Sequence, residues 1–224
     1  MIKNCFCTLL IAVLCFSCYS RPRIIFDASR PGITQVTNDC YTLNFSAEDG
    51  GVVQDVYFEN DLILEKIEDV YPTPSNNYRL SKARILDDGE SLISATYHKQ
   101  PKLTMNRSFV ILDDDQGLKL SWTVKNTGKD VITGQRTIRF LIKGSEIEST
   151  LKNGLLKIDL VTASGQELSL FLENSAEQAT GQVLIPYSQV NQEGMILELR
   201  DSSEFKRAPK QRAHWWFILR VEER

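Results

Sequence analysis

The sequence contains few residues of the kinds that build metal and redox sites. Four of its five cysteines fall within the first 18 residues, and it has only two histidines, His98 and His214. Cys40 is the single cysteine that follows, so the body of the chain cannot form an internal disulfide framework. Two histidines and one cysteine cannot assemble a zinc-type cluster either. We therefore expect a fold stabilised by an ordinary core that includes Cys40, without a metal or another cofactor.

The opening apolar run, from Phe6 to Phe16, is too short for a helix that spans a membrane, which needs about 20 residues. Lys3 precedes the run and Ser17-Cys18 follows it, which is the layout of a secretory signal. The segment resembles a bacterial lipoprotein signal, in which cleavage before the cysteine leaves that cysteine diacylated. On this resemblance, residues 1–17 are a signal peptide and Cys18 carries lipid.

Cleavage after Ser20 is the alternative, with Cys18 and Ser20 as the small residues that flank the cut. A lipid on Cys18 would make the protein a membrane-anchored lipoprotein of the bacterial cell envelope, whereas cleavage after Ser20 would make it periplasmic or secreted. Residues 18–32 contain two prolines and three arginines, and we expect them to form a tether.

The charge balance excludes one class of partner. A formal net charge of −3 gives no electrostatic support for binding nucleic acid. The remaining composition, 42% apolar and 25% charged, is typical of a globular domain, and residues 33–224 suffice for a single core.

Hydrophobic alternation dominates this domain. Apolar residues at 118, 120, 122 and 124 alternate with polar ones, and the same period recurs at 156–160 and 168–172. Gly-rich and Asp-rich turns separate these runs, for example Ser164-Gly165, and no amphipathic segment is long enough for a major helix. The pattern predicts an all-β fold, an antiparallel β-sandwich in a single domain.

Two runs are apolar at consecutive positions. They are Phe109 to Leu112 and His214 to Val221, and we expect both to form central strands buried on both faces.

Three segments point to a known group of folds. They read NDCYTLNFSAEDGGVVQDVYFEN, SATYHKQPKLTMNRSFVILDDDQGLKLSWTVKNTG, and EGMILELRDSSEF followed by HWWFILRV. They resemble the first hairpin, the middle hairpin and the end of the galactose-mutarotase-like supersandwich proteins. The first two also resemble the periplasmic domain of the YidC-type membrane insertases. The resemblance implies the supersandwich fold and covers about half of the chain.

The mutarotase reaction requires a carboxylate base and an acid, normally histidine, that protonates the ring oxygen. Carried over to this sequence, the resemblance puts Glu198 at the position of the base. The acid corresponds to the stretch GQRTIRFLIKG, which contains Arg139 and no histidine. Arginine stays protonated at any working pH and cannot transfer a proton. Catalysis is therefore not expected, and Glu198 is a catalytic candidate only if another acid is present.

Three hypotheses of function remain. The first is a saccharide-binding module that uses the concave face of the larger sheet, with His98, Arg139 and Trp216 as ligand-binding residues and Glu198 beside them. The second is an interaction or envelope-assembly module, by analogy with the insertase domain. The third is a sugar epimerase-like enzyme.

Two charged segments each allow two interpretations. Asp113 to Asp115 could bind Ca²⁺, but a hairpin turn fits their position between two strands better. The segment from Lys206 to Arg212 has four cations in seven residues, which fits a solvated loop or a contact with an anion or a lipid headgroup.

Overall fold

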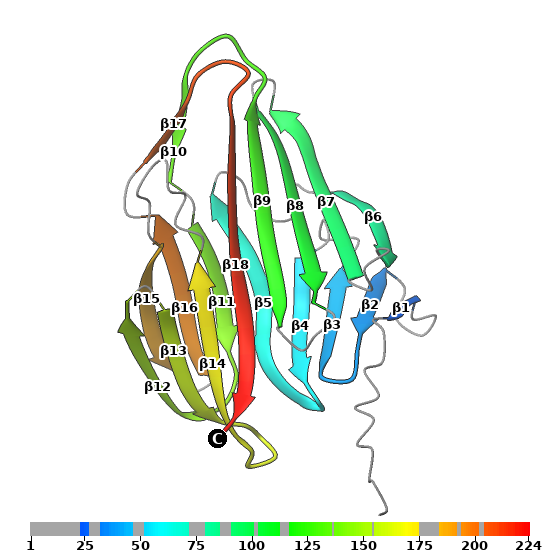
Figure 1. Ribbon diagram of the computed structural model, residues 1–224, viewed down its shortest axis with the longest axis vertical. Coiled ribbons are helices and arrows are strands. Elements are labelled where there is room, and N and C mark those ends of the chain that lie inside the picture. Colours follow the sequence, from blue (N-terminus) through cyan, green and yellow to red (C-terminus); the bar gives the residue numbers. More distant parts are fainter. Residues whose placement is uncertain are drawn as a thin grey trace, which may run out of the picture.

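The described part of the chain consists of β-strands and their connections. The computed structural model describes residues 23–26, 32–46, 52–71, 79–85, 91–100, 103–112, 117–135, 137–153, 155–174, 184–191, 194–201 and 204–224. These residues form 18 strands (Figure 1). Among them there is no helix long and apolar enough to cross a membrane.

Sixteen of the strands build two large sheets in which neighbouring strands run antiparallel. The order in the first sheet is β1 (Arg23–Phe26), β2 (Ile33–Thr37), β3 (Tyr41–Ser46), β4 (Val52–Phe58), β5 (Asp61–Tyr71), β11 (Thr137–Ile142), β16 (Gly194–Asp201) and β15 (Leu184–Asn191). The order in the second sheet is β12 (Ser145–Lys152), β13 (Leu155–Val161), β14 (Glu167–Asn174), β18 (Arg212–Glu223), β9 (Leu118–Asn126), β8 (Leu103–Ile111), β7 (Ser91–Gln100) and β6 (Arg79–Ile85). A third, two-stranded sheet pairs β10 (Ile132–Gly134) with β17 (Phe205–Arg207).

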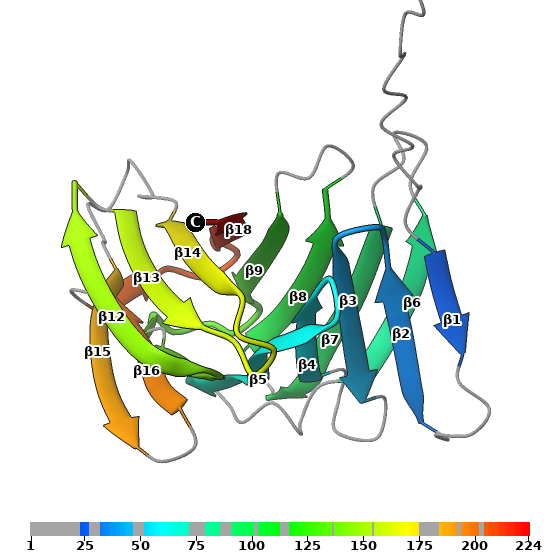
Figure 2. The same ribbon diagram turned by 90° about the horizontal axis from the view of Figure 1, so that it is seen from below.

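The two large sheets form the layers of a sandwich, as the view from below shows (Figure 2). Aromatic side chains meet across the layers: the ring centroids of Phe140 on β11 and Phe217 on β18 lie 6.2 Å apart. Those of Phe45 on β3 and Phe109 on β8 lie 5.3 Å apart. The predicted all-β antiparallel sandwich is confirmed.

The alternation in the sequence explains which side chains face the core. In β8, every second residue from Leu103 to Ile111 is buried and the residues between them are half-buried. The buried set includes Arg107, whose guanidinium lies 5.3 Å from the ring centroid of Phe109. In β13, Leu156 and Ile158 are buried for the same reason. The runs of period two therefore form strands, as predicted.

Strand β18 differs in part from the prediction. It lies in the interior of the second sheet, between β14 and β9, which confirms a central position. Only one of its faces is buried, however: Trp215, Phe217 and Leu219 point into the core, whereas Trp216 and Ile218 are half-buried. The apolar residues on the second face lie on an outer surface of the sandwich, because no third layer covers that face among the described residues.

The segment predicted as a tether contains a strand. Arg23–Phe26 forms β1 and pairs antiparallel with β2 at the edge of the first sheet. The physical reason is the run Ile24-Ile25-Phe26, whose β-branched and aromatic residues favour a strand. The predicted signal peptide and Cys18 lie outside the described residues. Cys40 is partly buried and packs against the core.

Candidate functional site

The outer face of the first sheet carries an acidic residue between two basic ones. In β11, Ile138 and Phe140 are buried in the core, so Arg139 points to the opposite, outer side. In β16 the same alternation turns Glu198 outward, and the register of the two strands places Arg139 directly opposite Glu198. The two residues that the resemblance singled out separately are therefore brought together.

Glu198 is bound by arginines on both sides. Its Oε2 accepts hydrogen bonds from Nη2 of Arg139 at 2.7 Å and from Nε of the same residue at 3.1 Å. Its Oε1 accepts a bond from Nε of Arg200, two positions further along β16. We call these three residues the clamp. Glu198 is only 4% exposed, whereas the side chains of Arg139 and Arg200 are 46% and 54% exposed.

This arrangement sets the ionisation of Glu198. Burial raises the pKa of the carboxyl, but the hydrogen bonds from Arg139 and Arg200, together with their charges, lower it by more. The pKa of Glu198 therefore lies below its ordinary value. A carboxylate with a lowered pKa holds a proton weakly, so it stays ionised at neutral pH and is a weak base.

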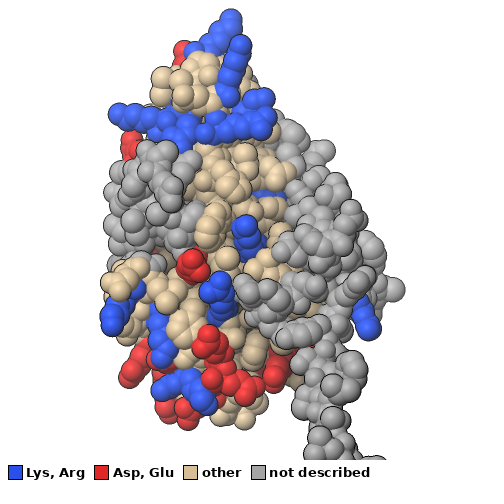
Figure 3. All heavy atoms as spheres, viewed as in Figure 1, with Lys and Arg blue, Asp and Glu red and all other residues tan. Residues whose placement is uncertain are grey.

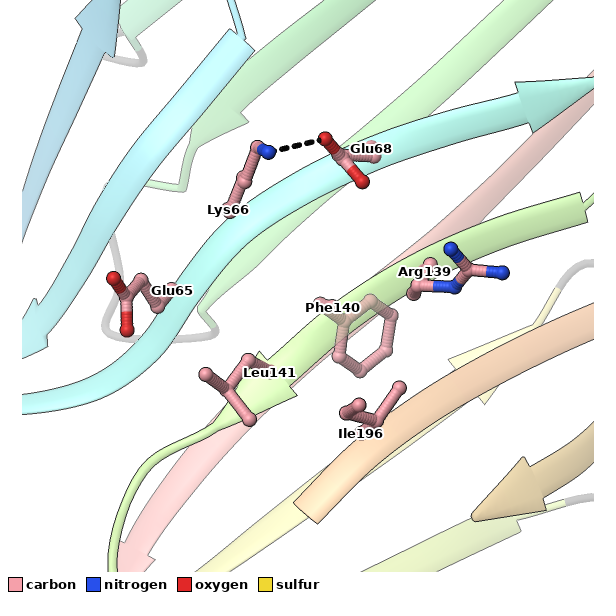
Figure 4. A pocket seen from close by; sticks show the side chains of 7 residues that line it. All are labelled: Glu65, Lys66, Glu68, Arg139, Phe140, Leu141 and Ile196. Atoms are coloured by element: carbon pink, nitrogen blue, oxygen red, sulfur yellow. Dashed lines mark ion pairs between the residues drawn. The ribbon is translucent and has the colours of Figure 1, made fainter. Parts of the chain in front are cut away.

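A pocket of about 190 Å³ lies beside the clamp, between β5 and β16 (Figure 4). Leu141 on β11 and Ile196 on β16 give it an apolar portion. Its other lining residues are Phe140, Arg139 and three charged residues of β5, Glu65, Lys66 and Glu68. Typical small-molecule sites have volumes of about 300–1,000 Å³, so this pocket is smaller than most of them. It has the same combination of apolar surface and a few polar groups.

A β-bulge shapes the wall that β5 contributes. The register between β5 and β11 shifts between Arg139 and Leu141, which oppose Glu68 and Glu65. Within this interval Lys66 has a φ of 54°, a left-handed conformation that costs a non-glycine residue about 1 kcal/mol or more. Lys66 pairs with Glu68 at 2.8 Å. Bulges of this kind redirect side chains near functional sites, and this one lies in the pocket wall.

A second ion pair crosses from β5 to the end of β11. Nζ of Lys143 lies 3.3 Å from Oε2 of Glu65, and both side chains are partly exposed. The four charged residues that line the pocket are two acids and two bases, so their formal charges cancel. The electrostatic character of the pocket is therefore that of a nearly neutral surface with many hydrogen-bonding groups.

The structure does not bring Trp216, another of the predicted ligand-binding residues, to this pocket. Trp216 lies on the outer face of the second sheet, because its neighbours Trp215 and Phe217 fill the core. Arg139 lies on the outer face of the first sheet, so the core separates it from Trp216. Nζ of Lys119 also lies 5.4 Å from the centroid of the Trp216 ring and covers part of it. The two residues cannot line one site.

His98 belongs to β7 of the second sheet, and its side chain lies outside the described residues. His214 lies on the outer side of the second sheet, where its Nδ1 is 3.0 Å from Oγ1 of Thr123. The described residues contain no group of three His, Cys, Asp or Glu side chains placed to hold a metal ion. The predicted turn at Asp113 to Asp115 is outside the described residues.

Sequence reasoning missed Arg200 and the three residues of β5. Arg200 was within reach of a sequence argument, because i and i+2 share a strand face and Arg200 follows Glu198 at that spacing. Glu65, Lys66 and Glu68 gave no such signal. They reach the pocket through the pairing of β5 with β11, which joins residues about 70 positions apart in the chain.

Comparisons with known proteins identify the fold. No family model and no curated protein matches the sequence. Among solved structures, a galactose mutarotase-like protein from Clostridium acetobutylicum is similar with a TM-score of 0.65 and 10% identity, over 92% of this chain and 99% of that one. A galactose mutarotase-like protein from Lactobacillus casei has a TM-score of 0.60 and 10% identity, over 85% and 100%. A putative aldose 1-epimerase from Escherichia coli K12 has a TM-score of 0.54 and 9% identity, over 83% and 97%.

These similarities establish a galactose mutarotase-like β-sandwich. The fold that the resemblance implied is thus confirmed, and it extends over most of the chain rather than half of it. At sequence identities of about 10%, a shared fold does not show which residues of this chain have a functional role. The similarity to the insertase domain remains a resemblance in sequence.

Proposed function

We propose that this protein is a lipid-anchored, non-catalytic protein of the bacterial envelope that binds a carbohydrate at the pocket beside the clamp. The observation that carries the proposal is the clamp itself. Glu198 is buried at a sheet surface with two half-exposed guanidinium groups fixed on either side of it. A built charged cluster at the rim of a pocket is a preorganised hydrogen-bonding site.

The chemistry of the pocket suits a sugar ring. Guanidinium groups present several N–H donors in a rigid plane, and sugar hydroxyl oxygens accept such bonds in pairs. Carboxylates of Glu65 and Glu68 can accept bonds from hydroxyl protons. Leu141 and Ile196 offer apolar surface to the C–H groups of the ring. The small volume favours a single ring or the end of a chain over a large flat ligand.

The clamp argues against proton transfer. Opening a sugar ring needs a base whose pKa lies near the working pH and an acid that can release a proton. The pKa of Glu198 is lowered, and both arginines remain protonated. The other charged lining residues are two glutamates and a lysine, and neither described pocket wall contains a histidine. We therefore favour binding over an epimerase activity.

The anchor is the second part of the proposal. The chain would be held in the envelope by acylation of Cys18, which the lipoprotein-like leader predicts. Metabolic labelling of cells with a palmitate analogue tests this part: label is expected on the wild type and absent from Cys18→Ser. Equal labelling of the two chains would refute lipidation at Cys18 and leave the binding proposal intact.

Binding is tested by glycan-array screening followed by isothermal titration calorimetry with the glycans that respond. Arg139→Ala is expected to weaken binding by about tenfold or more, because truncation removes a charged hydrogen-bond donor worth about 1.5–3 kcal/mol. Trp216→Ala is the matched control on the opposite face and is expected to bind like the wild type. Uniformly flat responses would refute the proposal, and loss of binding in Trp216→Ala alone would move the site to the second sheet.

Polarimetry with freshly dissolved aldoses tests the alternative of catalysis. We expect the wild type to leave the rate of mutarotation unchanged. A rate increase that Glu198→Gln abolishes would overturn the non-catalytic part of the proposal and assign Glu198 as the base. A rate increase that survives Glu198→Gln would show that the reaction occurs elsewhere.

A further inference from the structure

One end of the sandwich concentrates positive charge. Two segments meet there, residues 125–131 at and beyond the end of β9 and residues 204–212 around β17, and we call these two loops the basic tip. Figure 3 shows lysine and arginine side chains gathered at this upper end of the molecule. Their six cations are Lys125, Lys129, Lys206, Arg207, Lys210 and Arg212. The clamp lies elsewhere, on β11 and β16 in the lower half of Figure 1.

The charge of the basic tip is opposite to that of the rest of the chain. The same two loops contain two acids, Asp130 and Glu204, so 16 residues carry a formal charge of +4. The whole chain carries −3, which leaves −7 for all other residues. Solubility alone does not require the positive charges to be collected at one end of the molecule while the rest of the chain is negative. The asymmetry indicates a surface that faces an anionic partner.

The basic tip is a built structure in which one buried side chain joins the two loops. Asn126 is fully buried, and its Nδ2 donates to the main-chain oxygens of Asp130 at 2.7 Å and of Arg207 at 2.9 Å. Its Oδ1 accepts a bond from the main-chain N–H of Gly128 at 2.9 Å. Its own N–H donates to the oxygen of Gln211 at 3.0 Å. The cations are therefore displayed on a fixed frame.

An apolar side chain is exposed among these cations. Val131 follows Lys129 and Asp130 in the first loop and is 58% exposed, the largest exposure among the large apolar residues that the structure describes as exposed. A soluble polyanion would gain nothing from an apolar side chain at this place. An apolar side chain surrounded by cations does match the interface of an anionic bilayer, where the side chain enters the headgroup region and the cations contact phosphates.

We propose that the basic tip docks on an anionic phospholipid surface, with its cations on the phosphates and Val131 in the interface. This contact is independent of the carbohydrate pocket, and it adds a second, electrostatic attachment to any lipid at the N-terminus. The contact also orients the sandwich, because the basic tip occupies one end of its long axis.

Vesicle titration of the full chain carrying Cys18→Ser, which cannot be lipidated at that position, tests the proposal. Binding is expected to be much stronger to vesicles of phosphatidylcholine with phosphatidylglycerol than to phosphatidylcholine alone, and to weaken as salt is added. The double variant Lys129→Gln/Lys206→Gln is expected to lower the partition coefficient by about 25-fold, about fivefold for each cation. Lys119→Gln/Lys152→Gln, with the same change of charge outside the basic tip, is expected to change it less than twofold.

A photo-crosslinker separates contact by the basic tip from contact by any other part of the chain. The full chain with p-benzoylphenylalanine at position 131 is expected to form a phosphatidylglycerol adduct, whereas the same group at Leu151, another exposed apolar position, is not. Equal adducts at both positions, no adduct at either, or no difference between the two lysine double variants would overturn the proposal.

Val131→Ser distinguishes a bilayer from an acidic polysaccharide. This substitution is expected to weaken vesicle binding severalfold while leaving all cations in place. If vesicle binding is unchanged by Val131→Ser and polygalacturonate competes for the basic tip at lower concentration than the vesicles, the partner is an acidic polysaccharide and the membrane proposal is refuted.

Discussion

Replacing Glu198 by glutamine tests the clamp in the most direct way. Glutamine has nearly the same shape and keeps one oxygen acceptor, but it carries no charge and places an amide donor against a guanidinium. In the wild type both carboxylate oxygens are bound, one by Arg139 and one by Arg200. The variant therefore leaves two arginines beside a neutral group, with the repulsion between them no longer offset.

The expected loss of stability is about 1–2 kcal/mol. Breaking a fully buried ion pair costs about 3–5 kcal/mol, whereas an exposed pair contributes about 0.2–1 kcal/mol. Glu198 belongs to the first class by its burial, but the side chains of Arg139 and Arg200 are about half exposed. Water can therefore solvate both guanidinium groups in the variant. The expected loss of stability is then close to the sum for two exposed ion pairs. For a domain of this size the melting temperature should fall by about 2–8 °C.

The effect should depend on pH in a definite direction. Because the pKa of Glu198 is lower in the folded state, the unfolded chain binds its proton first as the pH falls. The carboxylate thus stabilises the fold fully above the unfolded pKa of about 4.3, and this contribution is lost as the pH falls through the lower, folded pKa. The difference between wild type and Glu198→Gln should be full at neutral pH and should shrink below about pH 4.

Urea unfolding at several pH values measures this difference. Glu65→Gln is the control on the same face, since Glu65 is more exposed and has a single pair with Lys143 at 3.3 Å. It should cost less than about 0.5 kcal/mol. A difference for Glu198→Gln that grows at acidic pH would refute the reasoning, because it would require a raised pKa of the carboxyl in the folded protein. A difference that stays constant with pH would refute it as well, because it would mean that the pKa is the same in the folded and unfolded states.

Two further predictions compare matched positions. Trp215→Ala should destabilise the fold by about 3–5 kcal/mol, because Trp215 is 2% exposed, whereas Trp216→Ala on the outer face should cost about 1 kcal/mol in the same urea unfolding experiment. Gly194→Ala should prevent stable folding, because Gly194 has a φ of 140° and a Cβ there would overlap a main-chain oxygen of β11. Gly165→Ala, with a φ of 91° and open space around it, should cost only about 1 kcal/mol in thermal unfolding, and similar losses at the two glycines would contradict this account.

Much of the fold could be predicted because alternation is a local property of the sequence. The residues of β9 and β13 alternate apolar and polar side chains, and those strands form with the expected face buried. Two features of the fold, strand β1 and the exposure of the outer face of β18, could not be predicted from local alternation. The run Ile24-Ile25-Phe26 lies beside prolines and arginines that favour a tether, and its pairing with β2 is a tertiary contact. The apolar outer face of β18 predicts a covering layer, and the described part of the chain provides none over Trp216.

The candidate site could be predicted only in part, for a related reason. The alternation around Ile138 and Phe140 predicts that Arg139 points away from the core, but not which residue it meets there. Its partner Glu198 lies 59 positions further along the chain, and only the register of β11 with β16 joins them. Local patterns likewise placed Trp215 and Trp216 on opposite faces of their strand. They could not reveal that Trp216 and Arg139 lie on opposite sides of the whole sandwich.

The charges of the two surfaces imply that they select different ligands. In the pocket the formal charges of Glu65, Lys66, Glu68 and Arg139 cancel, so an anionic sugar gains little net attraction there and meets two carboxylates. Neutral hydroxyl groups can accept hydrogen bonds from the basic side chains and donate to the carboxylates, without the charge repulsion that an anionic sugar would meet. The basic tip has the opposite character, with a formal charge of +4 on 16 residues. A neutral saccharide should therefore occupy the pocket without displacing the protein from anionic vesicles, and added salt should release the vesicles while leaving the saccharide bound.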